Sequence, residues 1–397
     1  MEVIYTGEDT PQTIKKSIFL AGPSLRPGQE KEMTSWRQDA IKILEDKGFD
    51  GVLFCPENRG FGFDNPNFNY DDQIEWENKH LNIADCILFW VPRDLSTDSK
   101  GQLKLPAFTT NIEWGAWADS GKVVFGSPPD FSKRKNKYLV YNAEEYNVPI
   151  GETLTETIEH ALEFLGEGAE RTNGEIYVPL FIWNTPSFQS WYKAQKDADN
   201  KLEHAQLLWS FRPGYKKTVF LWVLKVSIFI TEENRRSNNE FVLARTDISS
   251  VLFWHRRDNL LESEVVTIRE FRPPASGPDG FIHELPSGSS KDLSDSPAEV
   301  ASQEAHEETG FYLHPDRLSF GGARQMCATF SAHKAHLFYA EINEEELEWF
   351  KSQDGIVHGK KEDQERTYIE IKTISQLLEE NQTDWSTLGM VFSVVQK

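Results

Sequence analysis

The first 165 residues alternate short, wholly apolar segments with segments of helical periodicity, which limits the folds open to the chain. The apolar segments predict four β-strands, at residues 17–21, 52–55, 86–91 and 122–126. The other segments predict helices at residues 36–47, 71–84, 110–120 and 153–165. Strands that are apolar on both faces are typical of a parallel sheet covered by helices on each side. We therefore predict a doubly wound α/β domain, whose ligands bind at the carboxyl ends of its strands.

The chain is longer than one compact core usually needs, and its pattern changes along its length. Its 397 residues favour two domains. After a polar, glycine-containing stretch, a helix is predicted at residues 188–207, and long strands with later helices follow from residue 216. We expect a first domain at residues 1–165, a linker or helical connection at 166–214, and an α+β domain at 215–397.

An acidic helix is predicted in the second half of the chain, at residues 297–309. Ser296 supplies a capping box with a proline after it, and Gly310 a stop signal. Glu304, Glu307 and Glu308 are spaced to share one face of this helix. Three carboxylates so close favour a bound divalent cation, because such ions prefer oxygen ligands. The alternative is a solvated acidic helix face.

This segment resembles the signature of the Nudix hydrolases, G-x5-E-x7-R-E-U-x-E-E-x-G-U, in which U is an apolar residue. The matching residues are Gly288, Glu304, Ala305, Glu307, Glu308, Gly310 and Phe311. Gln303 stands in place of the arginine, the segment after Gly288 is one residue longer, and Asp295 replaces the first glutamate. The resemblance implies a Nudix sandwich that hydrolyses a diphosphate with Mg²⁺ or Mn²⁺, held by the three helix glutamates, with Glu307 also counted as catalytic.

Charged residues on both sides of this motif complete the predicted site. Residues 265–288 resemble the branch of the family that acts on ADP-ribose and nucleotide sugars. Arg269 or Arg272 could bind a diphosphate through paired hydrogen bonds, and Glu284 could join the metal ligands. Downstream, Glu365 lies where that branch carries a catalytic acid. The metal would activate water and neutralise the diphosphate.

Several segments of the first domain resemble the nucleoside 2-deoxyribosyltransferases. These segments are FLAGP at 19–23, Trp36-Arg37, and residues 73–94 and 109–128. The resemblance covers roughly residues 15–165 and implies a flavodoxin-like fold. It also implies that the base of a nucleoside is displaced from its sugar, without a cofactor. The nucleophile of the family is a glutamate before an apolar residue and a glycine, which here is Glu113.

A carboxylate suits this reaction, because the departing base leaves positive charge on the sugar, which an anion can stabilise or trap. Glu113 is expected in an early turn of a helix, where the macrodipole favours the ionised form. Glu77 takes the place of an acid that contacts the substrate and helps to protonate the base. Gly22 would let the substrate approach the backbone, and Asp94 would add a contact. The family often has an aspartate where this chain has Ala107.

Composition narrows the partners and the compartment. The net charge of −21 opposes nonspecific binding to nucleic acids or anionic membranes. Three widely spaced cysteines favour a reducing compartment and no zinc site. The longest apolar run, residues 219–230, is interrupted by Lys225 and too short for a membrane span. We expect a cytoplasmic enzyme of small nucleosides or nucleotides, and a homo-oligomer because both resembled families usually form oligomers.

Three functions remain open from the sequence. The chain could be a bifunctional enzyme that cleaves or exchanges an N-glycosidic bond and also hydrolyses a substrate resembling ADP-ribose or NAD. Alternatively, the chain could be a glycosidase regulated by its second domain, which would have lost catalysis and would sense a nucleotide, as Gln303 and the longer motif suggest. The third function is a nucleotide-binding scaffold without activity.

Overall fold

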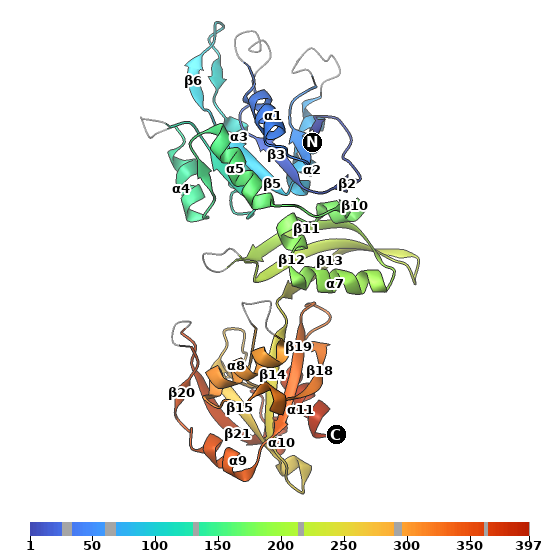
Figure 1. The fold of residues 1–397 in the computed structure, drawn as a ribbon, viewed down its shortest axis with the longest axis vertical. Helices are drawn as coiled ribbons and strands as arrows, with labels where there is room; N and C mark the ends of the chain where they lie inside the picture. The colour runs from blue at the N-terminus through green and yellow to red at the C-terminus, as the bar shows by residue number, and fades with distance from the viewer. Residues whose placement is uncertain are drawn as a thin grey trace. The chain divides into compact units, whose positions relative to one another are not determined.

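The chain divides into two compact units in a computed structural model (Figure 1). The units are Met1–Val242 and Leu243–Lys397. The structure describes residues 1–25, 34–59, 69–129, 135–212, 218–289, 296–360 and 364–396. The first unit includes residues 166–214, for which the sequence predicted a connection. In the described residues, every helix is too short or too polar to cross a membrane.

A six-stranded parallel sheet forms the centre of the first unit, in the order β1-β4-β3-β5-β8-β9. Its strands are β1 (Glu2–Tyr5), β3 (Ser17–Ala21), β4 (Val52–Cys55), β5 (Cys86–Trp90), β8 (Val123–Gly126) and β9 (Ile150–Gly151). The four predicted strands, β3, β4, β5 and β8, are buried along their whole length. The apolar runs thus identified the strands that are covered on both faces.

Helices cover both faces of this sheet, as the doubly wound prediction requires. They are α1 (Trp36–Asp46), α2 (Tyr70–Ile83), α3 (Phe108–Trp117), α4 (Lys137–Glu145) and α5 (Leu154–Leu165). Trp76 of α2 and Trp114 of α3 lie in one hydrophobic cluster, together with buried residues of α4. Leu44 of α1 and Ile158 of α5 lie in a second cluster. A hairpin of β6 (Asp94–Thr97) and β7 (Leu103–Leu105) precedes α3.

The chain after α5 returns to the sheet through a buried ion pair. Strand β10 (Arg171–Thr172) pairs with β2 (Thr13–Ile14). The guanidinium of Arg171 donates to both carboxylate oxygens of Asp85, at 2.7 and 2.6 Å, and both side chains are fully buried. Asp85 also accepts from the Ser17 hydroxyl and the Leu180 amide. This network attaches the segment after residue 165 to the first unit.

A three-stranded antiparallel sheet follows, preceded by η2 (Asn173–Tyr177), α6 (Leu180–Trp183) and α7 (Pro186–Asp197). Its strands are β11 (Lys201–Phe211), β12 (Leu221–Ile230) and β13 (Arg235–Arg245). The helix predicted at 188–207 is therefore wrong beyond Asp197. A turn with Asp199 at a φ of 55° ends it, and the following residues pair with β12. Phe188 of α7 packs on Trp222 of β12.

The second unit is built on a mixed sheet in the order β18-β19-β14-β15-β21-β20, with β16 paired to β15 and β17 to β14. The strands are β14 (Ile248–His255), β15 (Glu264–Phe271), β16 (Phe281–Glu284), β17 (Ser287–Gly288), β18 (Ser319–Gln325), β19 (Lys334–Glu341), β20 (Val357–His358) and β21 (Thr367–Thr373). Strands β14 and β19 are parallel, and β14 and β15 are antiparallel. The second half therefore has the expected mixture of strands and helices.

Two pairs of helices pack in separate hydrophobic clusters of this unit. The helices are α8 (Pro297–Thr309), α9 (Glu344–Lys351), α10 (Ile374–Glu379) and α11 (Trp385–Val395). Ala305 of α8 and Phe350 of α9 share one cluster, and Leu377 of α10 and Val391 of α11 share the other. Helix α8 has the predicted limits, because the Ser296 capping box is formed and Gly310 ends it at a φ of 75°.

Candidate functional site

A cavity of about 390 Å³ lies at the carboxyl ends of β3 and β4 in the first unit. Gly22, Glu77 and Glu113 all line it, so three predicted site residues meet there. Glu77 comes from the middle of α2, and Glu113 from the second turn of α3. Asp94 is not among the described lining residues, and its carboxylate accepts from the Ser96 amide at 2.9 Å. The cavity thus supports the predicted pair of glutamates but not a contact from Asp94.

Burial decides the protonation of these two glutamates. It raises the pKa of Glu113 to about 7, helped by the negative charge of Glu77 and opposed by Arg37. Burial also raises the pKa of Glu77, although the Gln73 side chain donates to it at 2.7 Å. Burial therefore outweighs the macrodipole, which was expected to favour ionised Glu113. Both carboxyl groups therefore keep their protons to a higher pH than an exposed glutamate does.

Arg37 lines the cavity and also holds its wall in place, a role that sequence reasoning missed. Its buried guanidinium donates to the carbonyls of Leu20 and Gly22, at 3.0 and 2.8 Å. It also donates to the hydroxyl of Ser24 and forms an ion pair of 2.9 Å with Glu57. These bonds fix the chain that leaves β3. The signal was the arginine beside Trp36 in the predicted helix, but nothing in the sequence showed which backbone it would bind.

Gly22 and Ala107 occupy unusual backbone positions beside the cavity. Gly22 has a φ of 148°, and a Cβ there would lie 2.2 Å from the carbonyl oxygen of Trp90. The glycine is therefore required by the close passage of β5, besides any approach of a substrate. Ala107 is the N-cap of α3 with a φ of 59° and has no side-chain cap. The wall near Glu113 accordingly has a methyl group where the resembled family often has a carboxylate.

Three carboxylates gather in the second unit, where Glu270, Glu308 and Glu365 offer oxygens that all lie within 4.8 Å of one another. They come from β15, from α8 and from the segment before β21. Burial raises the pKa of Glu270 to about 7 and holds that of Glu308 well above its ordinary value. Oxygen ligands at this spacing fit a hard divalent cation such as Mg²⁺ or Mn²⁺.

Sequence reasoning found two members of this cluster and missed Glu270. The helix motif indicated Glu308, and the charged segment at 360–368 indicated Glu365. Glu270 lies in an apolar strand and is almost completely buried. The sequence signal that could have identified Glu270 was a glutamate within an apolar strand, because buried carboxylates are rare unless they bind a partner.

The other two helix glutamates lie outside this cluster. Glu307 forms an ion pair of 2.5 Å with Lys360 and accepts from the Gln303 amide at 2.9 Å. Glu304 lies against Gly288, where an added Cβ would be 2.3 Å from its carboxyl carbon. The glycine therefore makes room for this carboxylate. Asp295 and the longer part of the motif lie outside the described residues.

Arg272 and Glu284 form an ion pair beside the cluster. The Nε and Nη2 atoms of Arg272 donate to one oxygen of Glu284, at 2.9 and 2.5 Å. Nη2 also lies 3.0 Å from Glu270. Burial raises the pKa of Glu284, while Arg272 lowers it. Arg272 thus balances part of the negative charge, and a substrate diphosphate would have to compete with these carboxylates for it.

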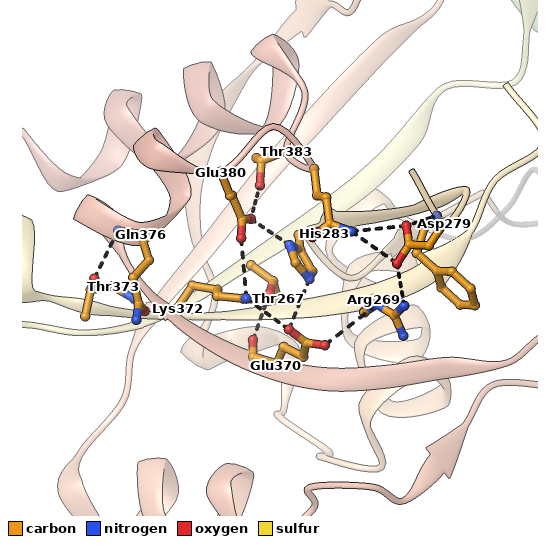
Figure 2. A network of polar contacts seen from close by, with 12 residues as sticks. Thr267, Arg269, Asp279, His283, Glu370, Lys372, Thr373, Gln376, Glu380 and Thr383 are labelled. Atoms are coloured by element: carbon orange, nitrogen blue, oxygen red, sulfur yellow. Dashed lines mark hydrogen bonds and ion pairs between the residues drawn. The ribbon is translucent and has the colours of Figure 1, made fainter. Parts of the chain in front are cut away.

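Figure 2 shows the polar network that includes the other predicted arginine, Arg269. Arg269 pairs with Asp279 at 2.8 Å. Buried His283 lies between Glu380, 2.6 Å from Nδ1, and Glu370, 3.1 Å from Nε2. His283 and Glu284 are neighbours on β16, so their side chains point to opposite faces of the strand. The contacts of His283 on one face thus hold the strand that carries Glu284 on the other. The network thus supports the site from the other side of β16.

Comparison with known proteins finds one segment of the chain similar to a known family. Residues 15–131 match the model of the family described as nucleoside 2-deoxyribosyltransferase like. The match includes Gly22, Glu77 and Glu113, and it supports an enzyme domain of nucleoside chemistry. No curated protein matches the chain.

One similar solved structure is described as the crystal structure of an ADP compounds hydrolase. It is 16% identical, covers 50% of this chain and 92% of its own, and has a TM-score of 0.34. A likeness at this level leaves the chemistry of the second unit to be argued from its own residues.

Proposed function

We propose that the first unit breaks the N-glycosidic bond of a nucleoside or nucleotide, with Glu113 as nucleophile. The observation that carries this proposal is the presence of Glu113 and Glu77 in one cavity at the carboxyl ends of the strands. The carbon–nitrogen bond breaks, its electron pair stays with the base, and Glu77 protonates the base. An oxygen of Glu113 bonds to the anomeric carbon. Water or a second base then displaces this ester and restores the carboxylate.

Substitution of the two glutamates tests this mechanism. We expect Glu113→Gln to reduce base release by at least about 10³-fold, because a nucleophile is lost. Glu77→Gln should reduce it by about 10²- to 10⁴-fold, as for a general acid. Glu75→Gln is the control, since Glu75 is exposed on the same helix. Mass spectrometry of products from a nucleoside panel gives the rates, and undiminished release by Glu113→Gln would refute the assignment.

For the second unit we propose metal-dependent hydrolysis of a diphosphate that links nucleoside-type groups, as in ADP-ribose or NAD. The proximity of Glu270, Glu308 and Glu365 carries this proposal. When bound, a divalent ion would neutralise the diphosphate and activate water. These three carboxylates would hold the ion, with Glu284 close by. A substrate with both a glycosidic bond and a diphosphate would suit both units.

Hydrolysis with and without metal tests this second activity. We expect monophosphates from ADP-ribose or NAD only when Mg²⁺ or Mn²⁺ is present. Glu308→Gln should abolish them, because it removes a buried ligand from the cluster. Glu345→Gln serves as the control, since Glu345 is exposed on α9. Equal product formation in the presence of a chelator would contradict the proposal.

One observation favours the alternative of a nucleotide sensor. Glu307 is bound to Lys360 and Gln303, so one motif glutamate is engaged within the protein. A sensor would bind ADP-ribose without converting it, and binding would alter base release at the first site. Calorimetry together with product analysis separates the two cases, because only an enzyme consumes the ligand.

A further inference from the structure

Gln73 lies beside Glu77 in the first cavity, one helical turn earlier on α2. Tyr70, Gln73 and Glu77 are spaced to share one face of this helix, and all three line the cavity. Glu113 reaches the same cavity from α3. A nucleoside whose sugar lies at Glu113 can therefore place its base along α2, where Tyr70 adds an aromatic ring for a flat base to contact.

The contact between Gln73 and Glu77 fixes the direction of the amide group. Nε2 of Gln73 donates to Oε1 of Glu77 at 2.7 Å. Of the two polar atoms of an amide, only the nitrogen can donate to an oxygen that accepts. The nitrogen of Gln73 therefore faces Glu77, and its oxygen is turned away from that contact.

Two oxygens of this pair remain for a ligand. Oε1 of Gln73 and Oε2 of Glu77 have no hydrogen-bond partner among the described residues. Neither atom is buried, and both belong to side chains that line the cavity. A base in the cavity can thus reach both oxygens without displacing a protein contact.

The two oxygens have opposite roles in hydrogen bonding. Oε1 of Gln73 can only accept. Oε2 of Glu77 is a donor while the side chain carries the proton that the proposed reaction gives to the base. The cavity wall thus presents a donor beside an acceptor, and it selects a base that presents an acceptor beside a donor.

Purines differ at the corresponding edge. Adenine presents N7, an acceptor, next to the N–H groups of its 6-amino substituent. A purine with oxygen at position 6 presents two acceptors at the same edge. Its O6 would face Oε1 of Gln73 with no proton between the two oxygens, which leaves both without a hydrogen bond.

We propose that Gln73 determines which base the first unit releases, and that it favours 6-aminopurines over 6-oxopurines. N6 of the base donates to Oε1 of Gln73, and Glu77 donates to N7. As the bond to the sugar breaks, its electron pair stays on N9 and the proton of Glu77 moves to N7. The base leaves as a neutral molecule, and Glu77 remains as a carboxylate. This inference rests on the base release proposed above for Glu113 and Glu77.

Rates of base release from adenosine and inosine test the selection, because these nucleosides differ at position 6. In the unaltered protein, kcat/KM should be at least about tenfold higher for adenosine, since inosine leaves an acceptor unpaired. Gln73→Leu should bring the ratio of the two values close to one. The matched control is Gln38→Leu, at an exposed glutamine of α1, which should keep the preference. The 2′-deoxynucleosides are compared in the same way.

The pH dependence of the same variant separates a contact with Glu77 from a general loss of structure. The hydrogen bond from Gln73 lowers the pKa of Glu77. Without it, Glu77 should keep its proton to a higher pH. The decline of activity on the alkaline side should therefore move to higher pH in Gln73→Leu and stay in place in Gln38→Leu.

Titration of the unaltered protein with free bases needs neither a variant nor turnover. In calorimetry at mildly acidic pH, adenine should bind at least about tenfold more tightly than hypoxanthine, which has oxygen at position 6. It should also bind more tightly than 7-deazaadenine, which lacks the N7 acceptor.

The outcomes distinguish this inference from the proposed function. Equal kcat/KM for adenosine and inosine, or a preference that survives Gln73→Leu, would overturn the role of Gln73 while leaving base release intact. Failure to release a base from every nucleoside would refute the proposed function instead. The free-base titrations then decide the inference, and equal affinities for adenine and hypoxanthine would overturn it.

Discussion

At the scale of single residues, the glutamate pair of the first cavity makes the reaction depend on pH. Glu113 must be ionised to attack, and burial raises its pKa to about 7. We therefore expect base release to rise as pH increases from 5 towards 7. The rate should fall again once Glu77, whose pKa is also raised by burial, loses the proton that the base needs. A pH–rate profile measures both limbs.

Removing the charge of Glu77 tests whether the rising limb of the profile reflects the raised pKa of Glu113. Glu77→Gln eliminates the negative charge that raises the pKa of Glu113, so the residual activity should reach its plateau at a lower pH. A rising limb that stays at the same pH in this variant would show that the two carboxylates do not interact.

Lys360 is a second single residue whose substitution should have a measurable effect, in this case on metal affinity. Its ammonium lies 2.5 Å from Glu307 and takes a carboxylate that the helix motif would offer to a metal. Lys360→Met should therefore increase Mn²⁺ affinity several-fold, because the competing cation is gone. Electron paramagnetic resonance of free Mn²⁺ measures this without reference to turnover. Lys193→Met, on an exposed lysine of α7, should have no effect, and an unchanged affinity in Lys360→Met would show that Glu307 takes no part in metal binding.

At the scale of helices and strands, predictions were accurate where a single chemical property decided the structure. Strands β3, β4, β5 and β8 were located to within one residue, because wholly apolar runs bounded by glycine, proline or charge fit only the centre of a sheet. Helix α8 was located by its caps. Residues 201–207 were predicted as helix from their composition, yet pairing with β12 makes them a strand. Local propensity is weak against such pairing.

Site residues, too, could be predicted where they lie in one continuous motif, and not where the fold brings distant residues together. Glu113, Glu77 and Glu308 were found because each lies in a motif that is continuous in sequence. Glu270 was missed because its partners are on α8 and beyond β20, and strand pairing alone brings them together. Asp94 was assigned from its place at a strand end, but β6 and β7 turn its carboxylate to the Ser96 amide.

The attachment of the segment after α5 can be tested through its buried ion pair. Arg171→Met leaves the charge of Asp85 in an apolar interior and should destabilise the first unit by about 3–5 kcal/mol. Adding Asp85→Asn should recover part of this loss, because the unpaired charge is removed. Urea unfolding of the two variants measures the difference. Equal losses in both would mean that the ion pair is not what holds the segment.

At the scale of the whole molecule, the two candidate sites are formed within different compact units. Each has its own hydrophobic clusters and its own acid–base groups. We therefore expect Glu113→Gln to leave metal-dependent hydrolysis unchanged, and Glu308→Gln to leave base release unchanged, within about twofold. Rates of both reactions in each variant check this. A loss of both activities in either variant would reveal that one site depends on the other.

The buried pair of Asp85 and Arg171 also leads us to expect a limit on how short a piece of this chain can be transferred between proteins and still fold. The family match at residues 15–131 includes Asp85 but ends before Arg171. A gene fragment cut at that limit would encode Asp85 without the arginine that balances its charge. Recombination that moves this domain between proteins therefore has to carry the later segment with it, or change Asp85 in the same event.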